Sequence, residues 1–299
     1  MITEQRNPNS TDIDLKSTSE IVQIFQEEDR KAVEAVAAES DAITHAVEMI
    51  VDAFREGGRL FYIGAGTSGR LGVLDASECP PTFSTEPEMV QGIIAGGDIA
   101  LRKAVEGEED IPERGAQVIR EYQLTSQDVL VGIASSGRTP YVLGALKEAH
   151  AIGVKTIFFS CVPPAEELKT FVDHFITPIV GPEIITGSTR LKAGTATKLV
   201  LNMLTTISMV KLGKVYNNLM VDVHASNKKL VERSIRIVQT VTGVDTALAD
   251  ATLKQAGGNA KIAIVMLAKE INRTDAAALL EKHNGFLRPI LDDLKQMET

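Results

Sequence analysis

Four short apolar runs rich in β-branched residues, separated by segments with helical periodicity, constrain the fold of this chain most strongly. They cover residues 59–63, 90–95, 128–133 and 155–160, and each is followed by a loop and a helix-like segment. Strands that alternate with helices in this way form βαβ crossovers, because parallel strands need a long connection between them. The pattern predicts an α/β protein with a parallel sheet flanked by helices, and a fifth strand near residues 175–180.

Helical segments precede and follow this alternating region. Residues 17–56 carry apolar side chains at helical spacing and end at two glycines, which predicts two amphipathic helices. Residues 189–212 are apolar around much of their circumference, which favours burial in the core or in a subunit interface. We therefore expect an N-terminal helical segment (1–56) that packs on an α/β domain (57–240), and a small C-terminal helical subdomain (241–299).

Composition and charge disfavour several classes of protein. The 299 residues carry a formal net charge of −9, which disfavours a surface that binds nucleic acid. The two cysteines, Cys79 and Cys161, are too few for a disulfide framework and lack the spacing of metal ligands. Residues 1–16 are polar, unlike a signal peptide, and no apolar run reaches the roughly 20 residues that span a bilayer. We expect a cytoplasmic protein that contacts neither nucleic acid nor membrane and holds no metal.

The loop after the first strand satisfies the G-x-G-x-x-G pattern of dinucleotide-binding loops through Gly64, Gly66 and Gly69. A dinucleotide site also needs an acidic residue about 20 residues further on, at the end of the second strand. The only candidate after that strand is Asp98, which lies much further from the loop and behind two more glycines. The fingerprint is incomplete, so the sequence disfavours a dinucleotide.

Hydroxyl side chains distinguish three segments that lie at expected helix starts. Helix N-termini favour anions, and short hydroxyl side chains donate to phosphate oxygens. For any one such segment taken alone, helix capping is the better explanation. Three of them, at helix starts or at the carboxyl ends of parallel strands, favour one crevice that holds a phosphorylated small molecule. The candidate binding residues are Thr67 and Ser68 in the first segment, Ser135, Ser136, Gly137 and Thr139 in the second, and Ser188, Thr189 and Lys192 in the third.

Four motifs resemble a known family. The stretches "GAGTSGRLGVLDASECPPT", "ASSGRTPYV", "TGSTRLKAGTATK" and "LGKVYNNLMVDV" are similar to those of the N-acetylmuramic acid 6-phosphate etherases. That family belongs to the sugar isomerase (SIS) domain superfamily, and the resemblance covers nearly the whole chain. It implies a three-layer αβα sandwich of the SIS type and a homodimer.

The resemblance also implies a reaction. The family removes the D-lactyl ether from C3 of N-acetylmuramic acid 6-phosphate and yields N-acetylglucosamine 6-phosphate and D-lactate, in the recycling of cell-wall amino sugars. Lactate is eliminated from the open-chain aldehyde and water adds back. Two carboxyl groups perform these steps without cofactor or metal. By resemblance, the proton donor corresponds to Glu78 and the general base to Glu109.

The residues themselves support these two roles unequally. Pro80 and Pro81 are expected to end the helix that carries Glu78, which places this carboxyl group at the negative end of the helix dipole, where the protonated form is favoured. A solvated surface glutamate is the alternative. Glu109 lies in the acidic stretch "VEGEED", which by itself is more typical of a solvated loop. His224 is a further candidate near the sugar, because its segment matches a family motif.

Two other functions remain open from the sequence. A sugar-phosphate isomerase of the same fold needs the same removal of the C2 proton but no leaving group at C3. A non-catalytic regulator that senses a sugar phosphate is the second alternative. The presence of one such domain without a basic DNA-binding segment counts against a regulator.

Overall fold

The computed structural model describes residues 2–223 and 228–297, and the chain divides into two compact units. The first comprises Met1–Ser77 and Pro87–Thr205, and the second comprises Glu78–Glu86 and Thr206–Thr299. Two long helices, α3 (Gly66–Phe83) and α7 (Lys192–Lys211), contribute residues to both units. In this division the N-terminal helices group with the sheet, whereas residues 206–240, which the sequence places with the α/β domain, group with the C-terminal helices.

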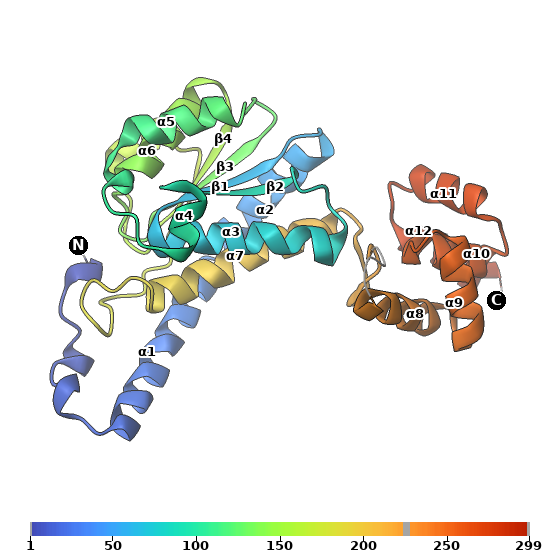
Figure 1. The fold of residues 1–299 in the computed structure, drawn as a ribbon, viewed down its shortest axis with the longest axis horizontal. Helices are drawn as coiled ribbons and strands as arrows, with labels where there is room; N and C mark the ends of the chain where they lie inside the picture. Colours follow the sequence, from blue (N-terminus) through green and yellow to red (C-terminus); the bar gives the residue numbers. More distant parts are fainter. Residues whose placement is uncertain (1, 224–227, 298–299) are drawn as a thin grey trace. The chain divides into compact units, whose positions relative to one another are not determined.

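The first unit is built on a five-stranded parallel sheet with the order β2-β1-β3-β4-β5 (Figure 1). All neighbouring strands pair in parallel, as the alternation of strands and helices predicts. The fifth strand is shorter than expected and begins slightly earlier. The strands are β1 (Leu60–Gly64), β2 (Val90–Ile94), β3 (Val129–Ile133), β4 (Lys155–Phe159) and β5 (His174–Ile176).

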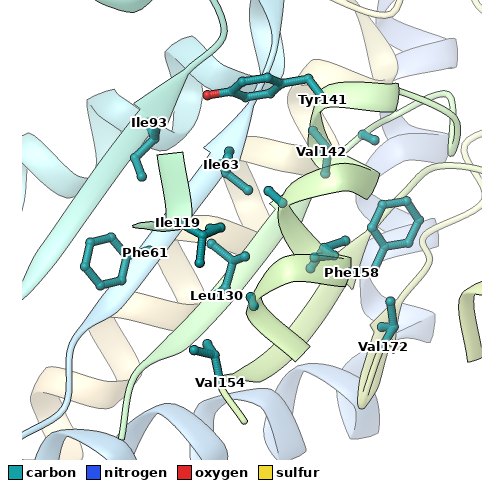
Figure 2. Close-up of a cluster of buried hydrophobic side chains, with 14 of the residues drawn as sticks. Phe61, Ile63, Ile93, Ile119, Leu130, Tyr141, Val142, Val154, Phe158 and Val172 are labelled. Carbon is teal, nitrogen blue, oxygen red and sulfur yellow. The ribbon is translucent and has the colours of Figure 1, made fainter. Parts of the chain in front are cut away.

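Helices cover both faces of this sheet, which confirms the expected three-layer arrangement (Figure 1). Side chains alternate between the faces of a strand, so Phe61 and Ile63 of β1 point to one layer. There they join a buried cluster with α5 (Pro112–Glu121) and α6 (Pro140–Ala151), which Figure 2 shows in close-up. Tyr62 faces the other layer, where its hydroxyl contacts the Asp75 carboxylate of α3 and the Leu201 carbonyl of α7.

The N-terminal helices are α1 (Thr18–Ala38) and α2 (Ser40–Arg55), close to the two helices that the sequence predicts. The hydroxyl of Ser17 accepts from the backbone N–H of Glu20, whose carboxylate accepts from the N–H of Ser17, so a capping box starts α1. Three short 3-10 turns precede α1, and α4 (Gly97–Arg102), η4 (Glu108–Asp110) and η5 (Glu166–Thr170) connect the later strands and helices.

The expectation that α3 ends before its two prolines is wrong. The helix continues through Pro80 and Pro81 to Phe83. Proline has a φ close to the helical value, so it fits a helix at the cost of the hydrogen bond that its missing N–H cannot make. The helix closes one turn later, where the N–H of Ser84 donates to the Pro80 carbonyl at 2.9 Å.

The described part of the second unit consists mainly of helices and has one hairpin, β6 (Val215–Tyr216) with β7 (Leu219–Met220). Its helices bury a separate apolar cluster, as expected for a small helical subdomain. The side chains of Asp245, Asn259 and Asn272 cap the N-termini of three of them. The helices are α8 (Lys228–Thr242), α9 (Thr246–Gln255), α10 (Ala260–Lys269), α11 (Arg273–Lys282) and α12 (Leu287–Met297).

The long apolar helix α7 is a core element in the part that belongs to the first unit. Ala193, Ala196, Val200 and Leu204 are fully buried there. The sequence alone does not distinguish between burial of this segment in the core and burial in a subunit interface. The structure favours the core for these positions.

Candidate active site

A cavity of about 340 Å³ lies at the carboxyl edge of the sheet in the first unit. The chain leaves β1 toward β2 on one side and then returns to place β3 on the other side of β1. Such a reversal separates the loops that follow the two strands and leaves a crevice between them. The lining residues are Ala65, Gly66, Thr67, Ser68, Glu109, Asp110, Ser135, Ser136, Arg138, Thr139, Pro140 and Thr189.

The cavity brings together hydroxyl side chains from all three segments that the sequence singles out. These are Thr67, Ser68, Ser135, Ser136, Thr139 and Thr189. Three other candidate binding residues, Gly137, Ser188 and Lys192, are not among the lining residues.

The turn from β1 into α3 supplies the first group of donors. Gly66 has a φ of +53°, and a Cβ on Gly64 would lie 2.7 Å from the backbone nitrogen of Gly69. Glycine at these positions lets the start of α3 approach the end of β1 closely. Ser68 follows on the first turn, and its Oγ lies 3.2 Å from the Oγ of Ser135. Both serines are nine-tenths buried, so little of their surface contacts solvent.

The start of α6 supplies the second group. Thr139 occupies the N-cap position, but its hydroxyl makes no capping hydrogen bond, and Pro140 occupies the first helical turn. The capping explanation therefore fails for Thr139, and its hydroxyl is available to a ligand. The N-termini of α3 and α6 both face the cavity, and each places the positive end of a helix dipole there.

Arg138 is a functional candidate that sequence reasoning missed. It lies between two of the expected binding residues in "ASSGRTPYV" and is the only cation among the residues that line this cavity. Its guanidinium suits a phosphate because it presents several donors in one plane. Its signal is present in the motif, but the candidate binding residues from the sequence are mainly hydroxyl side chains, with Lys192 as their only cation.

Lys192 has a structural partner instead. Its ammonium donates to Glu28 Oε2 at 2.6 Å, and each of these side chains is only 1% exposed. The backbone N–H groups of Lys192 and Ala193 donate to the carboxylate of Glu183, which covers the N-terminus of α7. Lys192 thus joins α1 to the start of α7.

Two carboxylates of the acidic stretch line the cavity, Glu109 and Asp110. They lie next to each other in η4, whose first residue, Glu108, lines a different cavity. Glu106 lines neither cavity. The geometry therefore distinguishes among these acidic residues, which the sequence pattern alone does not.

Glu78 lies on α3 at the beginning of the second unit and is exposed. It is not among the residues that line the 340 Å³ cavity. Because α3 continues to Phe83, Glu78 does not lie in the last helical turn, and the dipole argument for it no longer holds. The role of Glu78 as acid remains a prediction from resemblance. His224 lies outside the described residues.

Within residues 2–223 and 228–297, no three or more His, Cys, Asp or Glu side chains lie close enough together to hold a metal ion. Both cysteines are buried. In the same part of the chain, no helix combines the length and apolar character that crossing a membrane requires.

The fold and cavity place the chain in a class of protein. A parallel sheet with hydroxyl-bearing loops at a switch point is an arrangement suited to a small phosphorylated ligand. Residues 42–150 match the family model of the glucokinase regulatory protein N-terminal SIS domain. Residues 217–261 match the C-terminal lid domain of glucokinase regulatory protein. The first unit is thus an SIS-type domain.

Relatives narrow this class to one family. The chain is 54% identical over 293 residues to an N-acetylmuramic acid 6-phosphate etherase of Salinibacter ruber, a match that covers 98% of this chain and 94% of the relative. It is 55% identical over 288 residues to the etherase of that name from Rhizobium rhizogenes, covering 96% and 94%. The chain belongs to the N-acetylmuramic acid 6-phosphate etherase family. Among solved structures, a phosphoheptose isomerase from Neisseria gonorrhoeae superposes with a TM-score of 0.48 at 18% identity, covering 64% of this chain and 97% of that one.

Proposed function

We propose that this chain is a carbon–oxygen lyase that cleaves the D-lactyl ether of N-acetylmuramic acid 6-phosphate. The products are N-acetylglucosamine 6-phosphate and D-lactate, as expected in the recycling of cell-wall amino sugars. Family membership supports the proposal, and so does one observation on the cavity. A carboxylate, Glu109, lines the same cavity as the hydroxyl groups and helix N-termini that suit a phosphate.

The phosphate is proposed to lie at the starts of α3 and α6. The hydroxyls of Ser68, Ser136 and Thr139 donate to its oxygens there, and Arg138 supplies a cation. Thr67, Ser135 and Thr189 extend the same set of hydroxyl donors. This arrangement holds one end of the sugar and leaves Glu109 free to act at its other end.

Glu109 is proposed to remove the proton from C2 of the open-chain aldehyde. The carbonyl at C1 acidifies this proton, and a positioned carboxylate is a suitable base. The electrons of the broken C–H bond form a C2–C3 double bond, and the C3–oxygen bond breaks. The departing lactyl oxygen takes a proton, for which Glu78 is proposed as donor on the resemblance alone. Water then adds its oxygen to C3, and a proton returns to C2.

Release of D-lactate from N-acetylmuramic acid 6-phosphate by the pure protein is the expected result. In water enriched in oxygen-18, the label is expected at C3 of the sugar product, because the bond on the sugar side breaks. Unlabelled sugar together with labelled lactate would instead indicate hydrolysis at the lactyl carbon. Formation of a ketose from a sugar phosphate, without lactate release, would favour the isomerase alternative, and binding without turnover would favour a regulator.

The hydroxyls of the phosphate subsite give a second prediction. Ser136→Ala and Thr139→Val are each expected to raise KM about 10- to 150-fold, since a hydrogen bond to a charged group contributes about 1.5–3 kcal/mol. The kcat is expected to change less, because the phosphate does not react. Thr170→Val is a matched control, since the Thr170 hydroxyl donates to the Glu167 carbonyl on an exposed turn. An unchanged KM in both cavity variants would contradict this subsite.

Two further properties implied by the resemblance remain proposals, a homodimer and a cytoplasmic location. Sedimentation velocity of the full chain at micromolar concentration tests the first. A single species with the mass of one chain would contradict it.

A further inference from the structure

A second cavity, of about 370 Å³, lies in the first unit between the end of β2 and α5. We call it the α5 cavity. Its volume falls within the range of about 300–1,000 Å³ that is typical of small-molecule sites. Glu108 of η4 lines it, whereas the next residue, Glu109, lines the candidate active site. The proposed reaction uses none of the side chains that line the α5 cavity.

The hydroxyl of Tyr141 reaches this cavity without a protein partner. Tyr141 is 97% buried, with only 3% of its surface exposed, and lines the α5 cavity. Among the described residues, none forms a hydrogen bond with its hydroxyl. Figure 2 shows the ring at the edge of the apolar cluster with the hydroxyl oxygen directed toward Ile93, which also lines the cavity. The ring is buried while the hydroxyl opens into the cavity, so the geometry points to a ligand that accepts its hydrogen bond.

Charged groups of both signs line the α5 cavity. Arg114 Nε lies 3.8 Å from Glu108 Oε2, which is too long for a hydrogen bond, so the guanidinium is only loosely paired. Glu121 accepts a hydrogen bond of 2.6 Å from Gln117 and keeps its second carboxylate oxygen available. A cationic ligand would be opposed by Arg114, and an anionic ligand would be opposed by both glutamates.

Apolar side chains form the rest of the lining. Ile93 and Ile94 contribute from the end of β2, and Val118 contributes from α5. Tyr122 adds an aromatic ring that packs edge-on against Phe61 at a centroid distance of 6.2 Å. The cavity therefore combines one apolar side with a rim that carries both charges.

We propose that the α5 cavity binds a small zwitterion, an α-amino acid with an apolar side chain. Its carboxylate accepts from the Tyr141 hydroxyl and the Arg114 guanidinium, and its ammonium donates to Glu108 and Glu121. Its side chain lies against Ile93, Ile94 and Val118. A ligand with both charges pairs with the donors and the acceptors of this cavity at once, whereas a singly charged ligand pairs with only one of the two sets.

The titration of Tyr141 agrees with its role as a donor. Burial raises the pKa of the Tyr141 hydroxyl to about 12, and the nearby Tyr122, Glu121 and Glu108 act in the same direction. The hydroxyl therefore keeps its proton at neutral pH and remains a donor.

The test is calorimetric titration of the full chain, without sugar phosphate, using leucine and phenylalanine as probes. Each is expected to bind with a Kd of about 1 mM or below, a binding free energy of about −4 kcal/mol. Two analogues carry one charge each, 3-methylbutylamine and 4-methylpentanoate. Both are expected to bind at least about 5-fold more weakly, because each lacks one of the two charged contacts.

Two variants locate the binding. Tyr141→Phe keeps the packed ring and removes only the hydroxyl, so its thermal midpoint is expected to stay unchanged while Kd rises about 5- to 10-fold. Arg114→Gln is expected to raise Kd by a similar factor or more. Tyr216→Phe in the second unit is the matched control and is expected to leave Kd unchanged.

Three results would overturn the proposal. The first is that neither amino acid binds up to about 10 mM. The second is that a singly charged analogue binds as tightly as leucine. The third is an unchanged Kd in both Tyr141→Phe and Arg114→Gln. Because the titration contains no sugar phosphate and measures no turnover, its failure is distinct from failure of the proposed lyase activity.

Discussion

Glu109→Gln is expected to lower kcat for lactate release by about 10²- to 10⁴-fold, the usual contribution of a positioned general base. The amide has the shape of the carboxylate but cannot take the C2 proton. KM is expected to change little, because the phosphate contacts come from the starts of α3 and α6. The measurement is steady-state release of D-lactate from N-acetylmuramic acid 6-phosphate.

Hydrogen exchange at C2 separates the base from the acid. In D₂O, Glu109→Gln is expected to slow both lactate release and incorporation of deuterium at C2 of recovered substrate by the same large factor. Glu78→Gln is expected to lose lactate release and to keep the exchange, because proton removal precedes departure of the leaving group. This second readout tests the role of Glu78, which rests on resemblance alone.

Asp110→Asn is the matched control for Glu109. Asp110 is the adjacent residue of η4, lines the same cavity and loses the same charge on substitution. It is expected to retain most of the activity. A larger loss in Asp110→Asn than in Glu109→Gln would assign the base to Asp110 and contradict the assignment by resemblance.

The sheet was predictable because the strands are short, mainly apolar runs separated by segments with helical periodicity. Parallel strands buried on both faces need apolar residues at every position, and β1 and β3 are buried throughout. The course of α3 was not predictable in the same way. Local chemistry argues that Pro80 ends a helix, but the backbone of α3 remains helical to Phe83.

The candidate site was predictable to the extent that it depends on loops after strands. The sheet order brings the loops after β1 and β3 together, so Ser68 and Ser135 come within 3.2 Å although they are distant in the chain. Lys192 could not be judged in this way. Its position after a hydroxyl-rich loop is typical of a phosphate ligand, but its ammonium is buried against Glu28 of α1. Glu28 is distant in the chain, so no local sequence pattern predicts this contact.

Glu28 is the centre of a buried polar network in the first unit. Its carboxylate accepts hydrogen bonds from Lys192, Asn7 and Asn9, and it pairs with Lys31. Burial by itself raises the pKa of this carboxyl, but the hydrogen bonds from these four partners outweigh burial and lower it to about 2. The ionised form is therefore strongly stabilised by the fold.

Lys192→Met is expected to destabilise the protein by about 3–5 kcal/mol, the usual cost of removing one partner of a buried ion pair. Methionine fills the space of the lysine stem but leaves the Glu28 charge without its buried counterion. The measurement is the midpoint of urea unfolding with the slope held fixed. Lys31→Met removes the other cation that pairs with Glu28, but this side chain is about half exposed, so we expect a loss of no more than about 1 kcal/mol.

The lowered pKa of Glu28 also predicts how the stability of the protein changes with pH. The folded-state pKa of Glu28 lies below its ordinary value of 4.5, so the stabilisation is fully present above about pH 4.5 and is lost as the pH falls through about 2. The wild-type protein is therefore expected to be more stable than Glu28→Gln by a constant amount between about pH 6 and pH 8. This difference in unfolding free energy is expected to disappear as the pH falls from about 4.5 to about 2. Equal loss of stability in Lys192→Met and Lys31→Met, or an advantage over Glu28→Gln that does not depend on pH, would show that the network does not stabilise the ionised carboxylate. If the network does so, it fixes α1 to the start of α7, and with it the loop that brings Thr189 to the candidate active site.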